Sequence, residues 1–301
     1  MPKKIILISI LASLITIGLK LSAAYVSNSV GIFSDALESF INLIASCVAY
    51  MALSLAERPA DKKHTYGYNK VEYFASGLEG GLILVASGGI FYAAFKRFLH
   101  PQELNSLDWG VFLVLLSAVV NAIVAWILLR GARRYNSIVL EADAKHLLTD
   151  VITTLGVSLG VGIVYFWPQL KFVDPLLALL VALQILRTGY ELTQKSFWGL
   201  LDRALPQEEQ EQIEKIVKNH SVELTLHNLR TRKSGKKRFI DFHLLLDGKT
   251  SVQQAHDICC ELEEEIRKAF PESETTIHVE PIEDKRSWKD DFLRQAEKNK
   301  K

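Results

Sequence analysis

Excess charge of one sign is missing from this sequence, because 35 lysines and arginines stand against 34 aspartates and glutamates and leave a formal net charge of +1. Nucleic-acid binding needs surplus cations to replace phosphate counterions, so the balance argues against a nucleic-acid partner. Cysteine is scarce as well. Cys47, Cys259 and Cys260 give neither a disulfide framework nor a Cys-x-x-Cys metal knuckle, and nothing indicates an oxidising compartment.

Charged residues are also nearly absent from residues 5–56, whereas residues 202–301 alternate charged and apolar positions as soluble domains do. A bilayer core requires about 20 mostly apolar residues per helix. Six stretches meet this requirement, at about residues 5–26, 31–56, 72–99, 109–130, 140–166 and 173–200. A signal peptide is the alternative for the first stretch, but its apolar run is too long and five more stretches follow.

Lysine and arginine are distributed unequally between the short connections. One side collects Lys3, Lys4, Arg58, Lys62, Lys63, Lys70, Arg130, Arg133 and Arg134, and the other has only Lys96, Arg97 and Lys171. Basic residues accumulate in cytoplasmic loops. We therefore expect both termini in the cytoplasm, together with everything after about residue 203.

Soluble periodicity begins at Pro206. The pattern predicts a helix, two strands, a second helix and a third strand at residues 206–219, 222–231, 238–246, 251–270 and 274–281. The expected fold is thus an α-helical membrane protein with six transmembrane helices and a small cytoplasmic αββαβ domain of the α+β class. We expect the domains at residues 1–203 and 204–283, followed by a disordered tail at 284–301.

Polar side chains within the apolar stretches are functional candidates, above all the ionisable ones, each of which costs about 2.5–3.5 kcal/mol to insert. They fall on one face of the second stretch and in the fifth: Asp35, Glu38, Ser39 and Asn42, then Asp143, His146 and Asp150. Such oxygen and nitrogen ligands suit Zn²⁺, Fe²⁺, Co²⁺ or Mn²⁺. A hydrogen-bond cluster without metal is the alternative. Glu79 of the third stretch has three alternative roles: a proton site, an extra metal ligand or an ion-pair partner of Lys20.

The cytoplasmic domain has a second set of metal-ligand types on its predicted strands and helix: His227, His243, His256, His278 and Glu280. His278 and Glu280 share one face of a strand because side chains alternate with a period of two. The set predicts a cytoplasmic metal cluster.

Together, the six stretches, Asp-x-x-x-Ser in the second, His-x-x-x-Asp in the fifth and the histidine-bearing αββαβ tail resemble the cation diffusion facilitator family. The resemblance covers about residues 5–283 and is most specific at 34–39, 58–72, 141–150 and 227–235. It is closest to the bacterial zinc and iron exporters. It implies a homodimeric cation:proton antiporter of the bacterial inner membrane, whose cytoplasmic domain is similar to ferredoxins and metallochaperones.

Carried over to this chain, the resemblance implies a membrane transport site of Asp35, His146 and Asp150, with His146 and Asp150 also carrying protons. The fourth ligand position falls on Ser39, a weak ligand, so Asn42, Glu38 or water is expected to complete the site.

The resemblance also implies three features outside that site. Asp61 and His64 match a loop metal site, but Tyr68 stands where a further histidine is expected, so this site should be weak or vacant. The cytoplasmic set matches a binuclear cluster at the dimer interface. Lys70 and Asp202 match a charge pair between subunits.

The expected function is proton-coupled efflux of a divalent cation from the cytoplasm, with Zn²⁺ as the first candidate and Fe²⁺, Co²⁺ or Mn²⁺ as others. Metal would be both substrate and bound ion, and the partners would be a second copy, the lipid bilayer and protons. The chain would not be an enzyme. Two alternatives are a membrane-anchored metal sensor without transport and an intramembrane metallohydrolase, although no His-Glu-x-x-His motif occurs.

Overall fold

The computed structural model describes residues 2–27, 30–99, 109–167, 169, 172–220 and 224–288. Some side chains within helices lie outside this description, among them those of Asp35 and Glu38. The expected tail from residue 289 onward lies outside it as well. The chain separates into two compact units, Met1–Trp198 and Gly199–Lys301, and each is described by itself.

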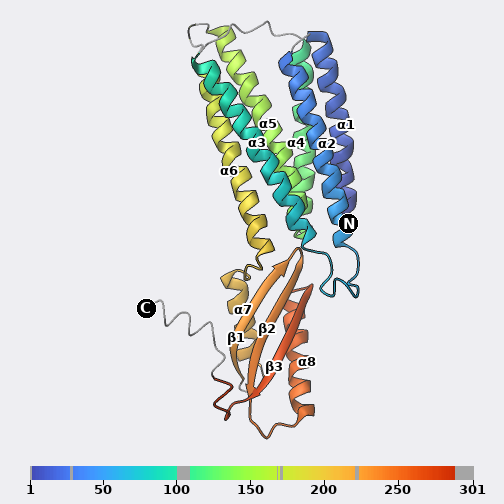
Figure 1. Ribbon diagram of the computed structural model, residues 1–301, viewed down its shortest axis with the longest axis vertical. Coiled ribbons are helices and arrows are strands. Elements are labelled where there is room, and N and C mark those ends of the chain that lie inside the picture. The colour runs from blue at the N-terminus through green and yellow to red at the C-terminus, as the bar shows by residue number, and fades with distance from the viewer. Residues whose placement is uncertain are drawn as a thin grey trace. The chain divides into compact units, whose positions relative to one another are not determined.

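In the described part of the chain, the first unit contains six long helices (Figure 1), each of which overlaps one of the expected stretches. They are α1 (Pro2–Ser27), α2 (Val30–Ala56), α3 (Val71–Leu99), α4 (Trp109–Tyr135), α5 (Ile138–Phe166) and α6 (Val173–Leu200). A helix forms all its backbone hydrogen bonds internally, which is required in hydrocarbon because lipid tails offer no hydrogen-bond partners.

Among the described residues, four helices are long and apolar enough to cross a membrane: Pro2–Tyr25, Val71–Lys96, Phe112–Tyr135 and Pro175–Leu200. In α2 the described apolar segment is shorter, Asn42–Ala56. The sequence of α5 is interrupted by Asp143, His146 and Asp150. The predicted transport residues of α5 thus interrupt an otherwise apolar helix.

Close helix packing depends on small residues in this unit. A Cβ atom added to Gly80 of α3 would lie 2.6 Å from Thr193 Oγ1 and 3.0 Å from the Thr193 backbone nitrogen of α6. Gly156 of α5 meets Val181 of α6 in the same way, at 2.8 Å. Small residues let helix backbones approach where lipid supplies no hydrophobic drive.

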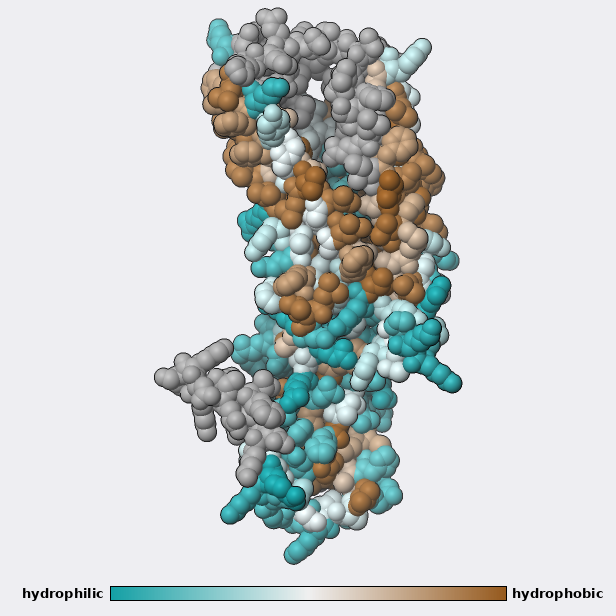
Figure 2. Space-filling view, viewed as in Figure 1, coloured by the Kyte–Doolittle hydropathy of each residue, from teal (hydrophilic) through white to brown (hydrophobic). Residues whose placement is uncertain are grey.

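The outer surface of the helices is largely apolar, as the brown areas over this unit in Figure 2 show. Large apolar side chains such as Leu11, Val85 and Tyr92 are 59%, 76% and 70% exposed. In water such a surface would be unfavourable. It is the surface expected of helices that face lipid.

The second unit has the element order α–β–β–α–β. It contains α7 (Gln207–Lys218), β1 (Thr225–Ser234), β2 (Lys237–Leu246), α8 (Val252–Ala269) and β3 (Ser273–Pro281). The sheet order is β1-β2-β3, with β1 and β2 antiparallel and β2 and β3 parallel.

Both helices of this unit cover one face of the sheet. Ile213 and Val217 of α7 and Leu262 and Ile266 of α8 pack with alternate residues of β2, including Phe242. Because side chains alternate along a strand, the neighbours of these core residues project from the opposite face. That opposite face receives the histidines.

The chain continues in an ordered turn beyond β3. Ser287 donates its hydroxyl to the Pro281 carbonyl oxygen at 2.8 Å, and Trp288 donates Nε1–H to the Ile282 carbonyl oxygen at 3.0 Å. Residues 284–288 thus differ from the expected disordered tail, because these hydrogen bonds fix them to the end of the strand.

Candidate metal sites

Polar side chains of α2 and α5 meet inside the helical unit. Asn42 is 4% exposed, His146 6% and Asp150 8%. The spacing of His146 and Asp150 places both on one face of α5, four residues apart. Their burial between apolar helices makes this the candidate transport site.

Asn42 connects the two α5 side chains. Its Nδ2–H donates to Asp150 Oδ2 at 2.5 Å, and its Oδ1 lies 2.5 Å from His146 Nε2. An amide oxygen can only accept, so Nε2 of His146 carries the hydrogen in this contact. Asn42 was one of the alternatives for the fourth ligand, and it contacts both His146 and Asp150.

Asn121 of α4 is a member of this cluster that the sequence did not single out. It is 2% exposed, and its Nδ2–H reaches Asp150 Oδ2 at 3.5 Å. Its Oδ1 is buried without a hydrogen-bond partner among the described residues. The sequence feature that could have identified Asn121 is its amide side chain within an otherwise apolar stretch.

The remaining predicted members of the transport site are placed less fully. Ser39 is buried on α2, 2% exposed, one turn before Asn42. The side chain of Asp35 lies outside the described residues, so its membership stays a prediction.

Three histidines form a row across the cytoplasmic sheet. His227 pairs with His243 in the β1–β2 register, and His243 pairs with His278 in the β2–β3 register. Their ring centroids are 5.0 Å and 4.9 Å apart. A register shift in β1 follows His227, where Asn228 has a φ of 52° and sends Nδ2 to within 3.4 Å of His243 Nε2.

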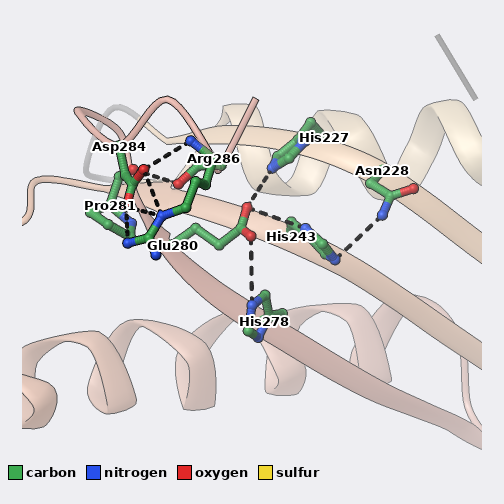
Figure 3. Close-up of polar contacts among 9 residues, drawn as sticks. His227, Asn228, His243, His278, Glu280, Pro281, Asp284 and Arg286 are labelled. Atoms are coloured by element: carbon green, nitrogen blue, oxygen red, sulfur yellow. Dashed lines mark hydrogen bonds and ion pairs between the residues drawn. The ribbon is translucent and has the colours of Figure 1, made fainter. Parts of the chain in front are cut away.

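Glu280 lies between these rings (Figure 3). Its Oε2 accepts from His227 Nε2 at 2.9 Å and His243 Nδ1 at 3.2 Å, and its Oε1 is 3.6 Å from His278 Nε2. Ligand atoms of His227, His243 and Glu280 all lie within 4.8 Å of one another. Two imidazoles and a carboxylate are zinc-type ligands. These residues fit a metal ion, with His227 Nδ1 buried and unpartnered in the described part of the chain.

His256 does not join this group within the chain. It is exposed on α8, where Cys260 Sγ lies 3.7 Å from its Nε2, and α8 packs on the helix-covered face of the sheet. The turn after β3 instead supplies an unexpected neighbour. The Trp288 ring stacks on His227 at 6.2 Å between centroids and 26° between planes.

The residues of the predicted loop site lie in a compact turn. Asp61 Oδ1 accepts from the backbone N–H groups of Lys63 and His64 at 2.8 Å, and Asp61 Oδ2 accepts from Tyr68 Oη at 2.6 Å. The Tyr68 hydrogen bond, followed by the two backbone bonds, lowers the pKa of Asp61 to about 2. Tyr68 thus donates a hydrogen bond to Asp61 Oδ2. A histidine at this position would leave that oxygen available to a metal ion.

Lys70 and Asp202 lie in different units of the structure. Within its own unit, Asp202 is 3.5 Å from Arg232 Nη1. The charge pair between subunits stays a prediction.

Comparison with known proteins adds to this geometry. The family description "Cation efflux transmembrane domain" matches residues 6–201, and "Cation efflux protein, cytoplasmic domain" matches residues 205–282.

Individual relatives cover nearly the whole chain. The "Uncharacterized transporter sll1263" of Synechocystis sp. is 42% identical over 97% of this chain and 95% of its own. The "Cation-efflux pump FieF" of Shewanella oneidensis is 31% identical over 91% of this chain and 92% of its own. A solved structure, "Metal-bound C-terminal domain of CzcD transporter from Thermotoga maritima", is 28% identical and covers 27% of this chain and 99% of its own, with a TM-score of 0.26.

The matched residues include both units and both clusters described above. The protein is an integral membrane protein with a cytoplasmic C-terminal domain that contains a small sheet. The chain belongs to the cation efflux family of transporters, also called cation diffusion facilitators.

Proposed function

We propose that the protein exports a divalent transition-metal cation from the cytoplasm in exchange for protons, with Zn²⁺ as the first candidate and Fe²⁺, Co²⁺ or Mn²⁺ as others. The observation that carries the proposal is the buried contact of Asn42 with His146 and Asp150. The "Cation-efflux pump" name of a relative with 31% identity supports cation export.

Metal and protons compete for the same atoms at this site. His146 Nε2 donates its hydrogen to Asn42, so it binds a cation only after that hydrogen leaves or moves to the other ring nitrogen. Asp150 Oδ2 likewise exchanges the Asn42 N–H for the cation. Metal needs an ionised Asp150 and an unprotonated nitrogen on His146. A proton held by the Asp150 carboxyl group, or a second proton on the His146 ring, therefore leaves when metal loads, and protonation of either group expels metal.

Asp35, His146, Asp150 and Asn42 are the proposed ligands, with Asn42 Oδ1 in place of the neutral Ser39. An inward proton gradient then drives metal outward if the site opens alternately to the two sides. In other transporters this occurs by rocking of one helix group against another.

We further propose that all six helices span the inner membrane of a bacterium, with both termini in the cytoplasm. The protein would work as a homodimer held by its cytoplasmic domains, and Lys70 and Asp202 would pair between subunits. His227, His243, His278 and Glu280 would hold resident metal that supports the dimer by cross-linking strands. His256 would reach that cluster only in the dimer.

Flux in proteoliposomes under an imposed pH gradient tests this function. Wild type should carry at least one of the four metals when the gradient is present, and Asp150→Ala should carry none. Asp257→Ala, which changes an exposed acid of α8, is the matched control and should behave as wild type. Normal flux through a folded Asp150→Ala protein would refute the site.

A membrane-anchored metal sensor is the second candidate, favoured by Ser39 at a ligand position and by the well-formed cytoplasmic cluster. It predicts no flux of any metal in the wild type while metal still promotes dimerisation. The same proteoliposome preparation, followed by a cross-linking assay with and without Zn²⁺, separates the two functions.

A further inference from the structure

Two acids that the transport site does not use meet between α3 and α5. Glu79 is 3% exposed and Asp143 2% exposed, and their carboxyl groups lie within hydrogen-bonding reach of each other. The charged group beside Glu79 is another acid, Asp143, whereas the sequence left Lys20 open as its partner. A buried acid that faces an acid requires a positive partner or a proton.

The hydrogen bonds around the pair leave one oxygen open on each carboxyl group. Ser46 of α2 donates its hydroxyl to Asp143 Oδ1 at 2.9 Å, and the Ser46 oxygen is 3.2 Å from the Ser9 hydroxyl of α1. Among the described residues, Glu79 Oε1 and Asp143 Oδ2 are buried without a hydrogen-bond donor. A single proton between the two acids makes one carboxyl group the donor and the other its acceptor, which two ionised carboxylates cannot do.

The surroundings contain few other ionisable groups. In the described part of the chain, Asp143 is influenced by Ser9, Ser46, His146 and Glu79, and Glu79 is influenced by Asp143. On the α6 side, α3 meets the uncharged Thr193 at the neighbouring Gly80. No described lysine or arginine therefore neutralises the pair.

The pair is close to the transport site without belonging to it. Asp143 precedes His146 by three residues on α5, and Ser46 follows Asn42 by four residues on α2. One turn of helix rises about 5.4 Å. A cation bound at the transport site would act on the proton of the pair through surroundings of low polarity, where charges interact strongly.

We propose that Glu79 and Asp143 form a proton-binding site separate from the metal ligands, which holds one proton while the transport site is empty and releases it when a cation loads. The O–H bond at the pair breaks as the cation arrives, and the proton leaves to water. Departure of the cation restores the proton from water. This inference rests on the proposed function and adds a second source of protons to it.

Counting protons released per Zn²⁺ bound tests the site, using the full-length protein in weakly buffered detergent solution with a pH indicator. The Glu79→Gln variant should bind Zn²⁺ but release about one proton fewer per protomer than wild type. Glu72→Gln is the matched control on the same helix, because Glu72 is buried but accepts a hydrogen bond from Ser137 at 2.9 Å. It should release as many protons as wild type.

A second readout keeps the proposal testable if Glu79→Gln folds poorly. In wild type, the infrared difference spectrum on Zn²⁺ loading should lose a protonated-carboxyl band, and this loss should be absent from Glu79→Gln and from Asp143→Asn. An unchanged proton count with an unchanged spectrum would overturn the site while leaving the transport function standing. Equal proton release by wild type and Asp150→Ala would instead count against the proposed function.

Discussion

Replacing Asn42 by alanine tests the centre of the proposed transport site. The substitution removes the two 2.5 Å contacts to His146 and Asp150 in a region where all three side chains are at least nine-tenths buried. A neutral hydrogen bond contributes about 0.5–1.5 kcal/mol and one to a charged group about 1.5–3 kcal/mol. The free energy of unfolding of the metal-free protein should therefore fall by about 2–4 kcal/mol.

The same variant should also bind metal less tightly. If Asn42 Oδ1 is a ligand or orients the other ligands, the affinity for Zn²⁺ at the membrane site should fall roughly 10- to 100-fold, with a parallel loss of gradient-driven flux. Chelator competition and flux in proteoliposomes measure the two effects. Denaturant unfolding in detergent, followed by tryptophan fluorescence, measures the stability.

Asn121→Ala is the matched control for this prediction. Asn121 is as buried as Asn42, but its contact with Asp150 is 3.5 Å long and its Oδ1 has no partner among the described residues. Its replacement should cost less than that of Asn42 in both stability and Zn²⁺ affinity. Equal effects of the two variants, or wild-type flux through Asn42→Ala, would refute the central role of Asn42.

Three further predictions concern other parts of the molecule. Tyr68→Phe should raise the pKa of Asp61 from about 2 toward 3.8, because the hydrogen bond from Tyr68 is removed. In the wild type Asp61 stays ionised down to about pH 2, and in the variant it should become protonated at a higher pH. An unchanged carbon-13 NMR titration of labelled aspartates would contradict this. Gly80→Ala should lower the free energy of unfolding by about 1–3 kcal/mol through collision with Thr193 on α6, and unaltered denaturant unfolding would show that the helices separate freely. Trp288→Ala should weaken Zn²⁺ binding at the cytoplasmic cluster roughly tenfold by exposing a stacked imidazole, and equal affinity in chelator competition would deny the ring that role.

Much of the fold follows from local patterns in the sequence. Apolar runs longer than a bilayer core predict the helices of the first unit, because hydrocarbon leaves a backbone few alternatives. The alternation after Pro206 predicts the αββαβ order. The structure places β1 at Thr225–Ser234, later than the expected strand at 222–231, because the short turn at Gly235 and Lys236 extends the hairpin.

The sequence also singled out most of the polar side chains in these clusters, but not their partners. Helical periodicity places His146 and Asp150 on one face of α5, yet it does not determine which residue of α2 meets them. Packing selects Asn42 and brings Asn121 from α4. It also sets Glu79 beside Asp143.

One physical reason separates what the sequence determines from what tertiary structure determines. The period of a helix or strand fixes the direction of each side chain relative to its own axis, and short-range rules of this kind can be read from sequence. The rotation of one element against another depends on contacts summed over residues distant in the chain, such as Gly80 against Thr193. Sequence therefore determined which helices and strands carry the candidate ligands, and only tertiary structure decided which of these side chains meet.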